Sequence, residues 1–141
     1  MRAVLDVNVL ISAVLSRHGA PAQLLTRWLA GEFELVISEA LLSELGRTLA
    51  YPKLISRVSP PEARRFIDAL RRAGEVVADA EDRPLRSVDP GDDYLLALAA
   101  DSSAILVTGD RHLLELSEQL PVRTPLQFLQ ALHAAADAER P

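Results

Sequence analysis

A short apolar run that ends on an acidic residue is the feature that most constrains this chain. The apolar residues 3–5 are followed at once by Asp6 and, two positions later, by Asn8, and a second apolar stretch covers residues 9–15. The first run is typical of a buried strand, and the second is long and apolar enough to begin a buried helix. In open α/β sheets, side chains at the C-terminal ends of strands face the crevice where ligands bind. Asp6 is therefore expected at the functional edge of a sheet.

Strand and helix patterns alternate along the whole chain. We expect strands at residues 3–5, 33–37, 75–77, 104–107 and 121–123, and helices at residues 9–15, 21–30, 38–50, 60–73, 94–102, from 111 and at 125–135. This alternation predicts a three-layer α/β/α sandwich with a central, mostly parallel sheet. Residues 79–90 are charged and carry two prolines, which predicts a loop, with a brief strand pairing at 85–88. We expect a single domain over residues 1–132 and a frayed tail over 133–141.

Composition narrows the class of protein. The chain has no cysteine, which excludes disulfides and thiolate metal sites and fits a reducing cytoplasm. No apolar run reaches the roughly 18 residues that a membrane helix needs, so we expect no membrane span. The net charge of −5 disfavours a protein that holds nucleic acid by charge alone. Lys53 is the one lysine among 15 basic residues. The resulting arginine content suits phosphate recognition, although the base composition of the source genome explains it as well.

Four acidic residues stand where a binding site is expected. Asp6 and Asp110 follow strands, Asp92 opens a helix, and Glu44 flanks the leucine stripe of another helix. Helix capping is an alternative role for Asp110 and Asp92, because aspartate satisfies free backbone amides at a helix start. Capping does not explain Glu44, because a carboxylate beside a leucine stripe is costly without a partner or a cation.

Acids that converge on one sheet edge favour a metal site. Their charges repel and raise each other's pKa, and a hard divalent cation relieves that repulsion. Mg²⁺ or Mn²⁺ suits a few carboxylates, waters and a substrate phosphate. Such ions can activate water and stabilise the leaving oxygen during phosphodiester cleavage. The three histidines show no ligand spacing, so we expect them on the surface and do not expect zinc.

Four segments, taken in order, resemble the motifs of the PIN domain family, and the toxin–antitoxin (VapC-like) subgroup fits best. Residues 4–13, with Asp6 and Asn8, look like the first motif, although Val7 stands where threonine is common. The second, third and fourth motifs are similar to residues 38–45, 89–99 and 107–110. Their acids would be Glu44, Asp92 and Asp110.

The resemblance implies a metal-dependent ribonuclease. Asp6, Glu44, Asp92 and Asp110 would be the catalytic residues that hold Mg²⁺ or Mn²⁺. Asn8 would hydrogen-bond and orient Asp6, and Thr108 would do the same for a neighbouring acid or a bound water. Asp93 is adjacent to Asp92 and is an alternative ligand, and Asp89 is a further one. The family also implies single-stranded or structured RNA as substrate, a cognate antitoxin protein and a homodimer.

Three other functions remain open at this point. An aspartate-nucleophile phosphatase also carries an acid after its first strand, but it needs a second Asp where this chain has Asn8. A catalytically silent module that binds RNA or protein is the non-enzymatic alternative, and the presence of all four acids disfavours it. A housekeeping RNA-processing nuclease would share the site and differ only in its targets and its partner.

Overall fold

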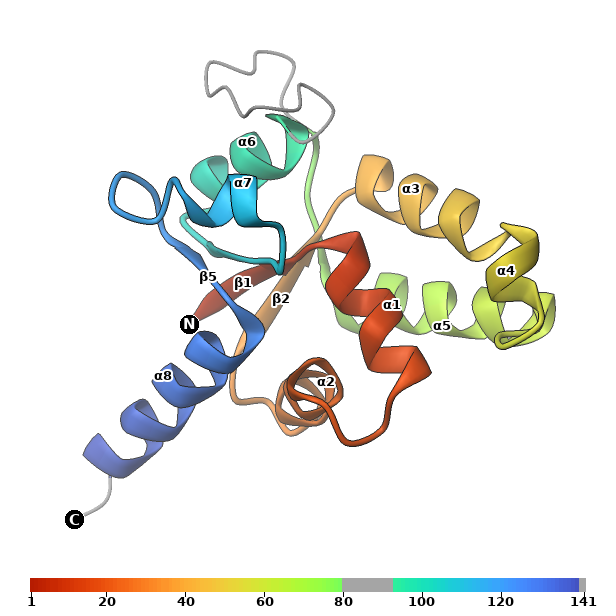
Figure 1. Ribbon diagram of the computed structural model, residues 1–141. Coiled ribbons are helices and arrows are strands. Elements are labelled where there is room, and N and C mark those ends of the chain that lie inside the picture. Colours follow the sequence, from red (N-terminus) through yellow and green to blue (C-terminus); the bar gives the residue numbers. More distant parts are fainter. Residues whose placement is uncertain (80–92, 140–141) are drawn as a thin grey trace.

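The protein is an α/β fold whose strands and helices alternate along the chain (Figure 1). The computed structural model describes residues 1–79 and 93–139. The elements are β1 (Arg2–Leu5), α1 (Val7–Leu15), α2 (Ala20–Leu29), β2 (Glu34–Ile37), α3 (Glu39–Leu49), α4 (Pro52–Ile55), α5 (Pro60–Ala73), β3 (Glu75–Val76), α6 (Asp93–Asp101), β4 (Ile105–Val107), α7 (Arg111–Leu114), β5 (Val122–Arg123) and α8 (Pro125–Ala138). Each strand predicted within these ranges is present.

The described strands form one parallel sheet with β1 at its centre. Within residues 1–79 and 93–139 the sheet has five strands in the order β3-β2-β1-β4-β5, and every neighbouring pair is parallel. The chain moves outward from β1 through β2 to β3, and then crosses back to β4 and β5 on the other side of β1. The order therefore reverses between β1 and β4, which is the place where sheets of this kind bind ligands. The predicted parallel α/β sheet is confirmed.

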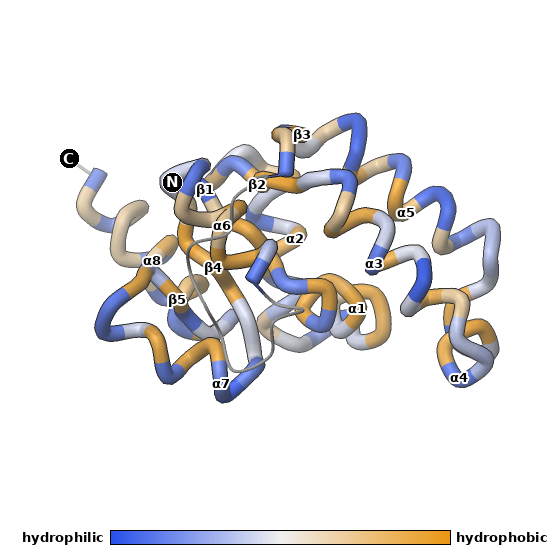
Figure 2. The backbone as a smooth tube through the Cα atoms, turned by 90° about the horizontal axis from the view of Figure 1, so that it is seen from above, coloured by the Kyte–Doolittle hydropathy of each residue, from blue (hydrophilic) through white to orange (hydrophobic). Residues whose placement is uncertain are grey.

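Helices bury the central strands. The last three residues of β1 and of β2 are buried, as parallel strands are when both faces are covered. Helix α6 packs on β1 and β4, and its first seven residues are all buried. Helix α1 packs against α2 and α3, and α8 contacts α2 and β5. Figure 2 shows apolar stretches gathered on the strands and hydrophilic residues recurring along α3 and α5.

Local sequence signals set several helix boundaries. The hydroxyl of Ser38 accepts a hydrogen bond from the Leu41 amide and so caps the start of α3, a role that serine commonly has. The leucine stripe behind that cap is buried throughout, at positions 41, 42, 45 and 49. The short helix α4 joins α3 to α5 and begins at Pro52, which suits the first position of a helix.

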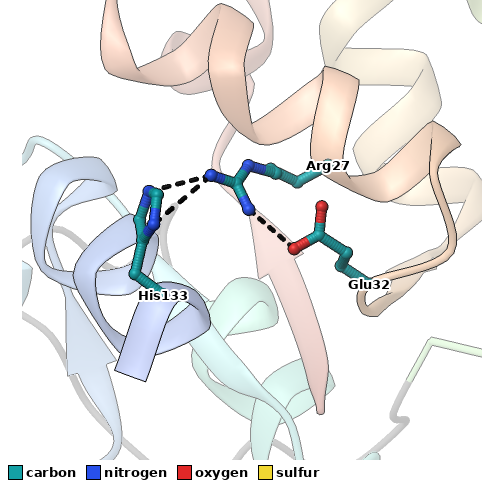
Figure 3. Close-up of polar contacts among 3 residues, drawn as sticks. All are labelled: Arg27, Glu32 and His133. Atoms are coloured by element: carbon teal, nitrogen blue, oxygen red, sulfur yellow. Dashed lines mark hydrogen bonds and ion pairs between the residues drawn. The ribbon is translucent and has the colours of Figure 1, made fainter. Parts of the chain in front are cut away.

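Helix α8 continues further than the sequence predicted. It runs to Ala138, so the expectation that the chain frays from His133 onward is wrong for this stretch. The segment after His133 is rich in alanine, the residue with the highest helix propensity. The helix is also tied to α2, because Arg27 donates to Nε2 of His133 over 2.9 Å and pairs with Glu32 over 2.8 Å (Figure 3).

Two further points concern membrane-spanning helices and the predictions that fall outside the described residues. None of the helices within the described ranges has the length and apolar composition needed to cross a bilayer. The predicted pairing at residues 85–88, and the predicted loop from residue 80 onward, lie outside the described residues.

Candidate active site

The ends of β1 and β4 bring Asp6 and Thr108 together. The two strands pair in register with Leu5 opposite Val107, and the Asp6 amide donates to the Val107 carbonyl over 2.9 Å. One residue further along, the Thr108 hydroxyl donates to Oδ2 of Asp6 over 2.7 Å. Both side chains are buried. An acid and its hydrogen-bond donor therefore meet at the reversal point of the sheet, although 102 positions separate them in the chain.

Asp110 joins the same chain of hydrogen bonds. Its backbone amide donates to the Thr108 hydroxyl over 3.0 Å, so that hydroxyl connects Asp110 to Asp6. Oδ1 of Asp110 accepts from the amide of His112 over 2.9 Å, which caps α7. The capping role that the sequence left open is thus present. It occupies one carboxylate oxygen, and a role as a metal ligand would use the other.

Glu44 reaches the site from α3. It is half-buried, and Oε2 of its carboxylate accepts a hydrogen bond from the Tyr94 hydroxyl on α6. Sequence reasoning gave Tyr94 no role. The signal that could have revealed it is a single phenol in a helix whose next five residues are aliphatic, placed beside a predicted acidic site.

The carboxyl group of Asp6 is electrostatically strained. Burial raises its pKa above the ordinary value, and the negative charges of Glu44 and Asp110 raise that pKa further. The hydrogen bond from Thr108 and the nearby backbone amide of Asn8 lower it, but burial prevails. Because Glu44 and Asp110 act on Asp6 through their charges, the three acids share one electrostatic environment. A cation placed among them would favour the ionised form of each.

The remaining predicted residues have different surroundings. The Asn8 side chain is exposed and makes no hydrogen bond within the part of the chain that the structure describes, so the expected bond to Asp6 is absent there. The backbone amide of Asn8, rather than its side chain, acts on Asp6. Asp93 is buried in the first turn of α6, directly before Tyr94. Asp92 and Asp89 lie outside the described residues.

The acidic side chains at this edge of the sheet suit a hard divalent cation, both in the type of atom that they offer and in their negative charge. These atoms are carboxylate oxygens, which Mg²⁺ and Mn²⁺ prefer, and the pKa of the Asp6 carboxyl is raised first by burial and then by the negative charges of Glu44 and Asp110. Across residues 1–79 and 93–139, however, no three acidic or histidine side chains stand close enough to hold one ion. A complete site therefore needs a further donor or a small movement of these side chains. All three histidines are exposed, as expected.

Comparisons with known proteins identify the family and the fold of the chain. A family model described as "PIN domain" matches residues 2–112. The chain is 26% identical over 142 aligned residues to the uncharacterized protein MJ1680 of Methanocaldococcus jannaschii, which covers 92% of this chain and 90% of that protein.

Two solved structures share the fold. The structure of VapBC-1 from nontypeable Haemophilus influenzae matches with a TM-score of 0.64 and 19% identity, over 89% of this chain and 99% of that one. A toxin–antitoxin complex from Klebsiella pneumoniae matches with a TM-score of 0.58 and 18% identity, over 87% of this chain and 97% of that one.

Proposed function

Because the chain belongs to the PIN domain family, we propose that it is a divalent-metal-dependent ribonuclease and the toxin component of a type II toxin–antitoxin system. One observation carries the proposal. Asp6 is buried at the point where the strand order reverses, is held there by the Thr108 hydroxyl, and lies within the fields of Glu44 and Asp110. Burying an acid among other acids costs stability, so its presence at this edge is best explained by a cation and an anionic substrate.

The catalytic residues of the proposal are Asp6, Glu44, Asp92 and Asp110, which would hold Mg²⁺ or Mn²⁺. The bound ion would supply a more acidic water and would stabilise negative charge on the cleaved phosphodiester. The residues of the chain itself orient the site. The Thr108 hydroxyl fixes one oxygen of the Asp6 carboxylate, and the cap on α7 fixes one oxygen of Asp110. The other oxygen of each carboxylate takes no part in those two bonds, and we assign it to the ion.

We infer supporting roles for Asn8 and Asp93 from their positions in the structure. Asn8 is exposed in the first turn of α1, the helix that Asp6 precedes, so we assign its amide to contact with substrate or with a bound water. Asp93 is buried at the start of α6, next to Tyr94, so we assign it to holding that end of the helix. Neither assignment requires the residue to be a metal ligand.

The proposed partners are RNA, a cognate antitoxin protein and a second copy of the chain. The toxin–antitoxin complex from Klebsiella pneumoniae supports the antitoxin. An apolar groove between α3, α4 and α5 supports a protein contact. It is lined by residues that include Leu49, Ile55 and Ile67, and Ile55 is 41% exposed at its edge. Exposed apolar surface of this kind often marks contact with another protein. The proposed location is the cytoplasm.

Cleavage of RNA tests the enzymatic part of the proposal. Labelled single-stranded and structured RNAs would be incubated with the wild type, with Asp6→Asn and with Asp101→Asn, each in Mg²⁺, in Mn²⁺ and in EDTA. Asp101 is an exposed acid at the end of α6, so its variant controls for the same change of charge away from the site. We expect metal-dependent cleavage by the wild type and by Asp101→Asn alone. Cleavage by Asp6→Asn at the wild-type rate would refute the proposed active site. RNA binding by the wild type without cleavage in either metal would favour the alternative of a catalytically silent binding module.

A further inference from the structure

Tyr94 lies at the acidic edge, and the sequence alone gave it no function. Its ring is buried, being 8% exposed, in a helix whose neighbouring residues are also buried. Its hydroxyl donates to Oε2 of Glu44, which lies 50 positions earlier in the chain. A phenol differs from phenylalanine only in that hydroxyl, and a buried hydroxyl is costly unless it has a partner. The oxygen of Tyr94 is therefore placed for Glu44.

Glu44 is the flexible member of the acidic set. Its carboxylate stands at the end of three rotatable bonds on α3, whereas Asp6 is fixed by Thr108 and Asp110 is fixed by its cap. Each of the other two acids thus has a neighbour that holds one of its oxygens. The Tyr94 hydroxyl completes this pattern for Glu44, because it holds Oε2 and leaves Oε1 for a ligand. Tyr94 itself is held rigidly, since α6 packs on β1 and β4 at the centre of the sheet.

We propose that Tyr94 is a positioning residue that directs the Glu44 carboxylate toward a divalent cation shared with Asp6. This inference rests on the metal dependence in the proposed function. The negative charge of Glu44 acts on Asp6, so a cation bound by both carboxylates would relieve that repulsion. Replacing a residue that hydrogen-bonds to a metal ligand and orients it typically changes the metal affinity.

The test measures metal affinity directly and needs no RNA. Binding of Mn²⁺ would be measured by electron paramagnetic resonance, and binding of Mg²⁺ by calorimetry, for the wild type, Tyr94→Phe, Tyr51→Phe, Glu44→Gln and the double variant Tyr94→Phe/Glu44→Gln. Tyr51 is the matched control, because it is 60% exposed and its hydroxyl does not cap the helix that it begins. Thermal unfolding without metal would establish that each variant is folded.

We expect Tyr94→Phe to raise the Mn²⁺ dissociation constant by roughly 10–100-fold, and Tyr51→Phe to leave it unchanged. In the Glu44→Gln background the Tyr94 substitution should have no further effect, because Tyr94 acts through Glu44. A merely structural hydroxyl would lower the unfolding temperature and leave the dissociation constant at its wild-type value. That result would overturn the inference, and so would an equal loss of affinity with and without Glu44.

A second measurement avoids any change at Tyr94. Tyrosine labelled with ¹³C at the ring carbon that bears the hydroxyl gives two signals, one for each tyrosine of the chain, and Tyr51→Phe assigns them. Addition of Mg²⁺ should shift the Tyr94 signal in the wild type and leave it in place in Glu44→Gln. A wild-type Tyr94 signal that does not respond to Mg²⁺, or a wild type that binds neither ion, would overturn the inference. Metal binding with the expected variant effects but without RNA cleavage would support the role of Tyr94 and refute the proposed nuclease activity.

Discussion

Replacing Thr108 by valine tests whether the hydrogen-bonded chain at the sheet edge stabilises the protein. Valine keeps the shape of threonine but lacks the hydroxyl that donates to Asp6 and accepts from the amide of Asp110. Position 108 is 0% exposed, so water cannot replace either bond. A hydrogen bond to a charged group contributes about 1.5–3 kcal/mol and a neutral one about 0.5–1.5 kcal/mol. The expected loss in the free energy of unfolding is therefore about 2–4 kcal/mol.

Thermal unfolding followed by circular dichroism, in EDTA at pH 8, measures this loss. For a chain of this length each kcal/mol lowers the unfolding temperature by roughly 3 °C, so the expected fall is roughly 6–12 °C. Thr108→Ser keeps the hydroxyl and should lose much less. The reasoning also sets a pH dependence. The Thr108 bond lowers the pKa of Asp6, so valine raises that pKa, and the penalty should shrink as the pH falls and Asp6 becomes protonated. Unfolding temperatures for valine and serine that agree within about 2 °C at pH 8 would refute the account.

The other predictions concern Asp6, the helix caps, the core and growth. Asp6→Asn should stabilise the fold at neutral pH. The folded-state pKa of Asp6 is raised, so the ionised acid costs stability above that pKa and the cost disappears as the pH falls toward the unfolded value. Urea unfolding at several pH values checks this, and a variant that is less stable at pH 7 contradicts it. Ser38→Ala removes the cap that accepts from Leu41 and should cost about 1 kcal/mol in the same assay; no change would mean that Asp79, which accepts from the Ala40 amide, suffices alone. Phe128→Ala, at a ring that is 0% exposed, should cost about 3–5 kcal/mol by calorimetry, and a cost below 1 kcal/mol would refute the packing described here. Expression of the chain alone should slow bacterial growth, and Asp6→Asn or Asp92→Ala should relieve it; equal slowing by wild type and variants would refute the toxin.

Several features of the fold could be predicted because they depend on neighbours in the chain. The Ser38 cap and the leucine stripe after it lie within a few residues of one another, and the alternation of apolar runs is sufficient to predict a parallel sheet. The predicted fraying from His133 onward was wrong, also because it was inferred from local sequence. A polar residue near the end of a chain suggested fraying, whereas the alanine-rich sequence that follows it and the contact with Arg27 keep α8 helical.

The acidic residues were identifiable individually, whereas the pairing of each with its partner was not, although the family resemblance gave Thr108 an orienting role toward a neighbouring acid or a bound water. Asp6 stands out because it ends an apolar run, and Asp110 because it follows another. No local pattern reveals that the Thr108 hydroxyl bonds to Asp6, or that the Tyr94 hydroxyl bonds to Glu44, because 102 and 50 positions separate the two members of these pairs. The side chain of Asn8, to which the sequence gave the orienting role, is exposed instead.

The sequence by itself determined which elements form, in which order, and which acids follow the strands, because apolar periodicity, capping and turn residues act over a few positions. The tertiary structure alone decided that β4 returns to lie beside β1, so that Asp6, Thr108 and Asp110 become neighbours. It also decided that α6 lies against β1, which carries the Tyr94 hydroxyl to Glu44. The physical reason is that strand order and helix packing minimise exposed apolar surface over the whole chain, and that sum has no local signature at the residues of the site.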